Sequence, residues 1–238
     1  MCLSQSDSII HQLPEYADAG YPPSYEYQLP AHIEDPMFSI IHPWFQHLSQ
    51  LTTVDAHKCL AERWKNIQHN AARCLRDHIL EYETRSIVIA GGCVWLLCVN
   101  GNAGINLVGP PLNENNAIAE HIPIGMEDNC LLVELLTHFH SLREDFPPGG
   151  GYLIDNHSWE YLNDPFIEKE VKGYSKWKNS LIIFHARNGD LLLQHPSGKV
   201  GWWVADEIKI KEAYNDLETC IMDFIHFQNK PWPFDSYG

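Results

Sequence analysis

The chain has 238 residues, of which 45% are hydrophobic and 11% aromatic. This composition excludes a disordered chain, and the length is sufficient to bury a core without disulfide bonds. The 31 acidic residues outnumber the 16 basic ones and leave a formal net charge of -15. Such a charge disfavours binding to nucleic acid and to anionic membranes, and it attracts cationic partners.

Cysteine usage and the absence of long apolar stretches indicate where the protein resides. Seven cysteines are an odd number, none of them forms a CxxC pair, and most lie in apolar runs. Buried free thiols of this kind are typical of a reducing compartment. The first residues lack a basic region followed by an apolar one, and no apolar stretch approaches the roughly 18 residues of a membrane span. We therefore expect a soluble, cytoplasmic protein that does not bind membranes.

Proline and tyrosine dominate the first segment, residues 1–34, with Pro22, Pro23 and Pro30 close to Tyr25 and Tyr27. This mixture predicts a flexible Pro/Tyr-rich arm and not a packed element. A similar short tail is expected at residues 230–238.

The next region, residues 35–124, has the pattern of helices followed by a three-stranded meander. A short helix is predicted over residues 37–48, and apolar residues at three-four spacing predict one long helix between Asp55 and Glu83. Thr52 and Asp55 form a capping box at its start. Three β-rich runs follow, at residues 86–90, 93–99 and 105–108, separated by the turn sequences Gly91-Gly92 and Asn100-Gly101.

Residues 125–229 repeat the order of helix and meander and end in a further helix. A helix is predicted from Asp128 or Asn129 to Leu142. Strands are predicted at residues 152–155, 181–187, 190–195 and 199–204, followed by a last helix at residues 214–228. The fold class is therefore α+β, with antiparallel meander sheets packed with amphipathic helices. The pattern leaves open whether residues 35–124 form a separate domain or a layer of one larger fold.

Two details of the second meander concern individual side chains. Arg187 and Asp190 flank the Asn188-Gly189 turn, so they are predicted to form a cross-strand charge pair. Trp202 and Trp203 are adjacent in one strand, so their rings are predicted to lie on opposite faces of the sheet, one of them in the core.

No pattern of catalytic or metal-binding residues is found. Cys74 and His78 have i, i+4 spacing, which suits a metal, but they belong to an apolar stripe and are better interpreted as core residues. HExxH, CxxC and GxSxG motifs are missing, and the Gly149-Gly150-Gly151 run follows a helix, whereas a phosphate-binding loop precedes one. We expect no catalytic residue, no metal and no cofactor.

The stretch from Leu181 to Trp203, LIIFHARNGDLLLQHPSGKVGWW, consists of an apolar strand, Gly-Asp, a second apolar strand, a Gly-containing turn, and then Val with aromatics. It resembles the SUKH (Smi/Knr) superfamily. In that family a helix and an apolar-Pro step precede the sheet and a closing helix follows it, which corresponds here to Leu131 to Phe146-Pro147 and to Tyr214 to Phe227. The likeness covers about 100 residues of the C-terminal half, and Pro147 to Gly151 matches the family's Gly-rich loop only in part.

The resemblance implies a non-enzymatic domain, found in bacteria as an immunity protein that neutralises a toxin, often a nuclease. The net charge of -15 fits such a role independently, because a basic nuclease presents a cationic groove. Local mixing of acidic and aromatic residues suggests a toxin-binding set, which comprises Asp155, Trp159, Glu160, Asp206 and Glu207.

Three alternatives remain open at this point. The family's fungal branch regulates cell-wall synthesis, which would make the chain a regulator. An enzyme of unrecognised family, such as a hydrolase that uses some of the 14 histidines, is a second alternative. The third is a regulatory scaffold protein that contacts its partner through the Pro/Tyr-rich arm.

Overall fold

The computed structural model describes residues 25–31, 33, 43–90, 93–99, 105–111, 129–139, 142–145, 151–153, 161–163, 170–186 and 189–226. The strands in these ranges are β1 (Tyr25–Gln28), β2 (Glu83–Ala90), β3 (Cys93–Val99), β4 (Ile105–Val108), β5 (Leu142–Asp145), β6 (Gly151–Leu153), β7 (Leu181–Ala186), β8 (Leu191–Gln194), β9 (Val200–Val204) and β10 (Lys209–Tyr214). The helices are α1 (Pro43–Ser49), α2 (Thr53–Arg63), α3 (Asn70–Leu80), α4 (Cys130–His138), α5 (Tyr174–Trp177) and α6 (Leu217–His226).

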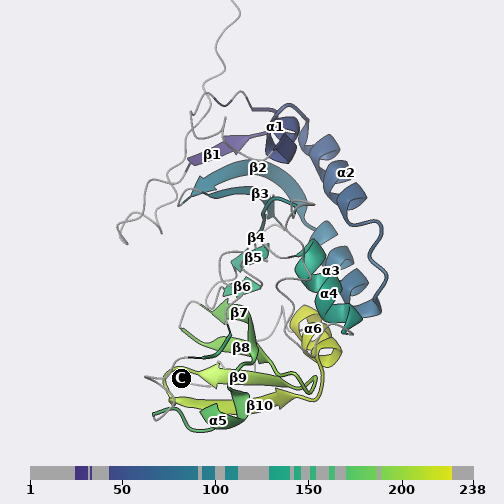
Figure 1. Cartoon of the computed structure of the whole chain (residues 1–238). Helices are drawn as coiled ribbons and strands as arrows, with labels where there is room; N and C mark the ends of the chain where they lie inside the picture. The colour runs from purple at the N-terminus through teal and green to yellow at the C-terminus, as the bar shows by residue number, and fades with distance from the viewer. Residues whose placement is uncertain are drawn as a thin grey trace, which may run out of the picture.

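The strands form one antiparallel sheet in which each strand pairs with its neighbours in chain order, from β1 to β10 (Figure 1). The two predicted meanders correspond to β2–β4 and to β6–β9. The short strand β5 joins them, because it pairs with β4 on one side and with β6 on the other. The expected α+β class, with antiparallel meanders packed against helices, is thus confirmed.

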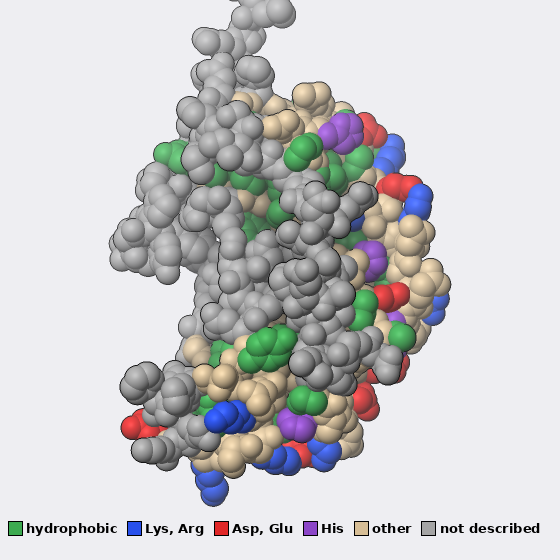
Figure 2. Space-filling view, viewed as in Figure 1, with side chains coloured by type: hydrophobic (Ala, Val, Ile, Leu, Met, Phe, Trp, Pro, Cys, Tyr) green, Lys and Arg blue, Asp and Glu red, His purple; other side chains and the backbone are tan. Residues whose placement is uncertain are grey.

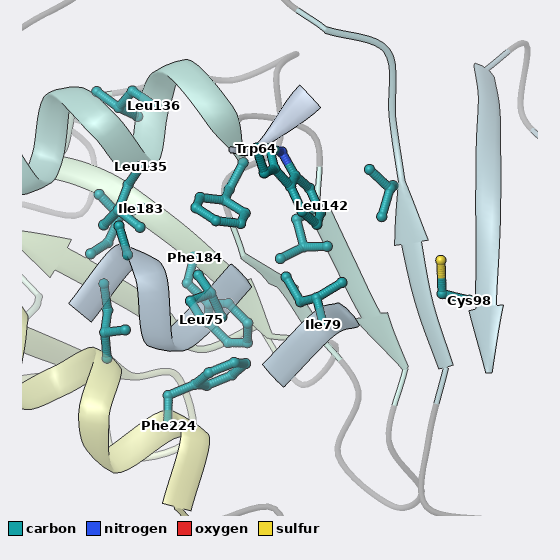
Figure 3. Packing of buried hydrophobic residues seen from close by; sticks show 14 of the residues in the cluster. Trp64, Leu75, Ile79, Cys98, Leu135, Leu136, Leu142, Ile183, Phe184 and Phe224 are labelled. Carbon is teal, nitrogen blue, oxygen red and sulfur yellow. The ribbon is translucent and has the colours of Figure 1, made fainter. Parts of the chain in front are cut away.

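Most helices cover one face of this sheet. Helices α1, α2, α3, α4 and α6 follow one side of the curved sheet, and their apolar residues share a single core cluster with the strands (Figure 1). Leu75 of α3, Phe184 of β7 and Phe224 of α6 point into this interior (Figure 3). Helix α5 packs on the opposite face, where Trp177 contacts Leu193 and Ile210 in a separate cluster. Among the described residues, no helix combines the length and apolar character that crossing a membrane requires.

The region predicted as one long helix consists of two helices, α2 and α3, so that prediction is wrong. The chain leaves helical geometry at Trp64, and α3 restarts after His69. The backbone N–H groups of Gln68 and His69 donate to the two carboxylate oxygens of Glu134 on α4, each at 2.7 Å. A carboxylate from a distant helix therefore satisfies donors at the start of α3, and Trp64 and Leu75 both stay in the core.

Helix starts agree with their capping residues. The Thr52 hydroxyl accepts a hydrogen bond from the Asp55 backbone N–H at 3.2 Å, which confirms the capping box. Asn129 accepts from the Leu132 N–H at 3.0 Å at the start of α4. The predicted helix over residues 37–48 is observed from Pro43, and residues 34–42 lie outside the described part of the chain.

Three element boundaries differ from the prediction. Helix α4 ends at His138, and Leu142 opens strand β5. Helix α6 begins at Leu217, and Tyr214 belongs to β10, a strand that the sequence did not predict. Strand β1 lies inside the predicted arm and pairs with β2, so this part of the arm is a packed element. Residues 1–24, the 230–238 tail and the predicted boundary between residues 124 and 125 lie outside the described ranges.

The two tryptophans of β9 lie on opposite faces, as predicted. Trp202 is buried in the large core cluster, and Trp203 is half-buried against the cluster beneath α5. Asp190 accepts hydrogen bonds from Trp202 Nε1 at 3.2 Å and from the Ala205 N–H at 2.8 Å. Its predicted partner Arg187 is outside the described residues.

Candidate functional site

The β9–β10 turn holds the two predicted toxin-binding residues that can be placed. Asp206 is exposed and has no ion pair within the described part of the chain. Glu207 lies between two lysines: it forms an ion pair with Lys209, and Lys211 Nζ lies 2.7 Å from its Oε1. Asp155, Trp159 and Glu160 fall outside the described residues.

Lysines surround this turn and the adjacent edge strand β10. The backbone of Lys172 pairs with the start of β10. Its N–H donates to Ile208 O at 3.1 Å, and its carbonyl oxygen accepts from the Ile210 N–H at 2.9 Å. Partial burial, together with the nearby charges of Lys211 and Lys172, lowers the pKa of Lys209. In Figure 2 several basic side chains gather at the end of the molecule where β9, β10 and α5 lie.

The acid on the other face of β10 is also shared by two lysines. Glu212 accepts from Lys176 of α5 at 2.7 Å and from Lys199 at 2.6 Å. These hydrogen bonds lower the pKa of Glu212 to about 2. The β10 edge is therefore a charge-compensated, lysine-rich region, and Glu207 is not part of an uncompensated acidic surface.

Uncompensated acids occur on α6. We define the α6 acidic surface as Asp216, Glu218 and Asp223, which have no ion pair with any described residue. Asp216 and Glu218 are exposed, and Asp223 is half-buried. Asp216 and Asp223 flank Cys220, and they add to the effect of burial in raising the pKa of that thiol. This surface was not among the predicted site residues, although the sequence of the last helix contains all three acids.

Part of the α6 acidic surface also has a structural role. The Asp216 carboxylate accepts a hydrogen bond from the Thr219 backbone N–H at 2.7 Å, which lowers the pKa of Asp216. Acids at the start of a helix stabilise it through its dipole. Within the described residues, the carboxylates of Glu218 and Asp223 make no hydrogen bond that gives them a structural role like that of Asp216. These two acids of the α6 acidic surface are therefore available to a partner.

Arg63 at the end of α2 joins three parts of the fold. Its guanidinium donates to Gly109 O at 2.8 Å, to Pro110 O at 3.2 Å and to His138 O at 3.4 Å, and it lies over the Trp44 ring at 5.0 Å. Burial lowers the pKa of Arg63 to about 9, so the side chain remains charged at neutral pH. Carbonyl oxygens and an aromatic face stabilise the cation here, which is a structural role that sequence patterns do not reveal.

A row of buried polar groups crosses the sheet beneath α2. His57 Nδ1 lies 3.3 Å from Thr84 Oγ1, which lies 3.8 Å from Cys98 Sγ. Burial raises the pKa of Cys98 to about 12, so its thiolate is not formed at neutral pH and the row does not provide a nucleophile. Asn106 faces Cys98 in register, is fully buried, and has no hydrogen-bond partner among the described residues for either amide atom.

Histidines and cysteines do not gather into a metal site in the described part of the chain. His78 is 8% exposed and stacks edge-on against Tyr82, with ring centres 5.4 Å apart, which confirms its interpretation as a core residue. Cys74 is half-buried on the same helix. No group of three or more His, Cys, Asp or Glu side chains within the described ranges is placed to hold a metal ion.

Comparison with known proteins does not assign the chain to a family. No family model matches it, and neither a curated protein nor a solved structure is significantly similar to it. The SUKH resemblance therefore depends on the motifs between Leu131 and Phe227 alone.

Proposed function

We propose that the chain is a non-enzymatic binding protein of the immunity type, which neutralises a toxin by covering a basic surface such as a nuclease groove. The observation that carries this proposal is the α6 acidic surface. Glu207 and Glu212 beside the β10 edge are shared by lysines, whereas Glu218 and Asp223 are not neutralised by any described residue. Uncompensated charge of this kind gives fast, salt-dependent association with a cationic partner.

The order of elements in the C-terminal half also supports the proposal. The SUKH resemblance implies a helix, a meander and a closing helix in that order. Residues 130–226 contain α4, the strands β5–β10 and α6 in this sequence, with the short α5 between β6 and β7. The closing helix of the resemblance is the element that displays the uncompensated acids.

A toxin would be inhibited by occlusion and not by chemistry. A basic nuclease binds its substrate through phosphate contacts, which weaken as competing anionic groups occupy the same lysines and arginines. The net charge of -15 favours the encounter at long range, and the α6 acidic surface would then supply the short-range contacts.

The first experiment is a pull-down with the tagged full-length chain from its native lysate, with washes at low and at high salt, followed by mass identification. We expect a basic protein recovered at a one-to-one ratio, lost in the high-salt wash, whose toxic activity is inhibited by the purified chain. Recovery of no basic partner, or of a partner whose activity is unaffected, would contradict the proposal.

Two double variants with the same net charge test which surface binds. The variant E218Q/D223N and the control E207Q/E212Q each convert two carboxylates to amides, so the net charge changes from -15 to -13 (-15 + 2) in both. We expect the first to weaken partner binding by about a hundredfold or more, since each of the two interfacial charges contributes about 1.4 kcal/mol or more, which is about tenfold. Equal binding by the two variants would show that the contact surface is not α6.

A further inference from the structure

A cysteine and a histidine from neighbouring helices lie together on the surface formed by α1 and α2. Cys59 is in the second half of α2, and His47 is in the last turn of α1. The distance from Cys59 Sγ to His47 Nε2 is 3.9 Å. A short hydrogen-bonded turn joins the two helices, and the Thr52 cap starts α2, so the two side chains are brought together by well-defined local structure.

Three other described cysteines provide a comparison, and a further one, Cys130, is exposed at the start of α4. Cys98 and Cys220 are buried, and burial raises the pKa of both thiols, so neither is reactive at neutral pH. Cys74 on α3 is half-buried like Cys59, and His78 follows it by one helical turn, but no hydrogen bond joins the Cys74 sulfur to an imidazole of the described residues. Cys59 and Cys74 therefore form a matched pair of partly exposed helical thiols, of which only Cys59 has an imidazole nitrogen of the described residues within hydrogen-bonding distance.

We propose that Cys59 is a thiol modification site that reacts with low-molecular-weight disulfides, with His47 as the general base. With its own proton on Nδ1, the His47 imidazole can accept the thiol proton at Nε2. The Cys59 sulfur then attacks one sulfur of the disulfide, so that a new S–S bond forms and the S–S bond of the reagent breaks. Cys59 is oxidised to a mixed disulfide, and the other sulfur of the reagent is reduced to a thiolate as the S–S bond breaks. This leaving thiolate then takes the proton from the imidazolium and departs as a thiol.

Neighbouring charges on α2 do not oppose this reaction strongly. Asp55 precedes Cys59 by one helical turn, but its carboxylate is held by Lys58 at 2.9 Å and by the Thr52 hydroxyl at 2.9 Å. Glu62, one turn after Cys59, forms an ion pair with Lys65. The positively charged Arg63 is four residues after Cys59, on the same side of α2. The charges around the thiol are therefore balanced, so a thiolate formed there meets little net repulsion.

The site is separate from the α6 acidic surface. Helices α1 and α2 lie at one end of the helical layer and α6 lies at the other (Figure 1). Modification of Cys59 therefore does not depend on the proposed toxin-binding function, and its test requires no partner.

The experiment measures how fast each cysteine of the folded, full-length protein reacts with glutathione disulfide at pH 7. Free thiols are blocked with N-ethylmaleimide after timed intervals, and the protein is digested with trypsin. Lys58 and Arg63 bound the peptide with Cys59, and Arg73 and Arg76 bound the peptide with Cys74, so the two rates are read separately. Because an ordinary thiol is only a few per cent thiolate at pH 7, we expect Cys59 to react about tenfold faster than Cys74. Equal rates would overturn the proposal.

Variants of His47 separate a base from a merely structural neighbour. We expect His47→Ala and His47→Gln to lower the Cys59 rate to that of Cys74 without changing the Cys74 rate. Free imidazole added to His47→Ala should restore part of the lost rate, which a structural role would not explain. A Cys59 rate that is unchanged in both variants, while Cys98 stays protected as evidence of folding, would exclude His47 as the base.

Discussion

At the scale of single residues, Ile208 is in an unfavourable conformation. It follows Glu207 in the β9–β10 turn with a φ of 49°, in the left-handed region, and its side chain is 52% exposed. Glycine is the usual residue at such a position because a β-branched side chain crowds the backbone there. Neither burial nor conformational preference explains an isoleucine at this site.

We predict that Ile208→Gly stabilises the protein. Relief of left-handed strain contributes about 1–2 kcal/mol, and the greater flexibility of glycine in the unfolded chain offsets about 0.5–1 kcal/mol of it. The free energy of unfolding, measured by urea denaturation, should therefore rise by roughly 0.5–1 kcal/mol. Ile208→Val keeps the branched side chain and should give no gain. A loss of stability in the glycine variant would mean that the Ile208 side chain makes a favourable contact.

Glu212 makes the stability of the folded protein depend on pH. Lys176 and Lys199 lower its pKa from 4.5 to about 2 in the folded protein. A lowered folded-state pKa stabilises the protein above pH 4.5, and this stabilisation is lost as the pH falls from about 4.5 to about 2. The stability difference between wild type and Glu212→Gln should therefore shrink over this range. The control Glu83→Gln removes an exposed acid without an ion pair in the described structure and should show no such change.

At the scale of elements, α5 approaches the sheet closely at a glycine. A side chain at Gly201 of β9 would place its Cβ 2.7 Å from two ring carbons of Trp177 on α5. Trp177 is buried, so its ring has little room to move. The absence of a side chain at position 201 thus determines how near α5 lies to β9.

We predict that Gly201→Ala destabilises the protein by about 1–3 kcal/mol, which is typical of overpacking in a close-packed core. The same substitution in a Trp177→Phe background should have a smaller effect, because the smaller ring leaves space for the methyl group. Thermal and urea unfolding of the four proteins in this double-mutant cycle measure the coupling. Equal effects of Gly201→Ala in the two backgrounds would show that the clash is not the cause.

Helix boundaries illustrate what could and could not be predicted at this scale. Caps at Thr52 and Asn129 are local, so the sequence predicted where α2 and α4 begin. The break between α2 and α3 depends on Glu134, which reaches Gln68 from a helix more than 60 residues later in the chain. A single apolar stripe is compatible with one helix or two, and only the tertiary contact distinguishes them.

At the scale of the whole molecule, the core is continuous from the first helices to the last. Leu75 of α3, Phe184 of β7 and Phe224 of α6 belong to one buried cluster (Figure 3). Strands β4, β5, β6 and β7 continue the sheet across the same region. Residues on both sides of position 124 thus share their buried surface.

We predict that Leu75→Ala affects the C-terminal half of the chain as well as its own helix. Loss of a buried leucine costs about 2–5 kcal/mol. If the shared core unfolds as a unit, amide hydrogen exchange should become faster in β8 and β9 as well as in α3 and β2. The control Arg73→Ala, an exposed site on the same helix, should leave exchange unchanged. Faster exchange confined to α3 and β2 would show that the halves unfold independently.

The candidate binding residues show the limits of sequence patterns most clearly. Asp206 and Glu207 were selected from the local mixing of acidic and aromatic residues, yet Glu207 is shared by Lys209 and Lys211. Adjacent positions in sequence say little about which charges are neutralised, because ion pairs form across strands and between elements. Glu218 and Asp223 carry the same kind of carboxylate as Glu207, and what distinguishes them is the absence of a lysine partner among the described residues.

The sequence by itself determined the class of the fold, because alternation, turn chemistry and helix caps are encoded within a few neighbouring residues. It predicted the two meanders, the opposite faces of Trp202 and Trp203, and the buried position of His78. The tertiary structure decided the rest: the joining of the meanders through β5, the edge strands β1 and β10, the division of α2 from α3, and which acids remain uncompensated. These features depend on hydrogen bonds and charges between residues far apart in the chain, and such pairings become defined only when the sheet and the helical layer have come together.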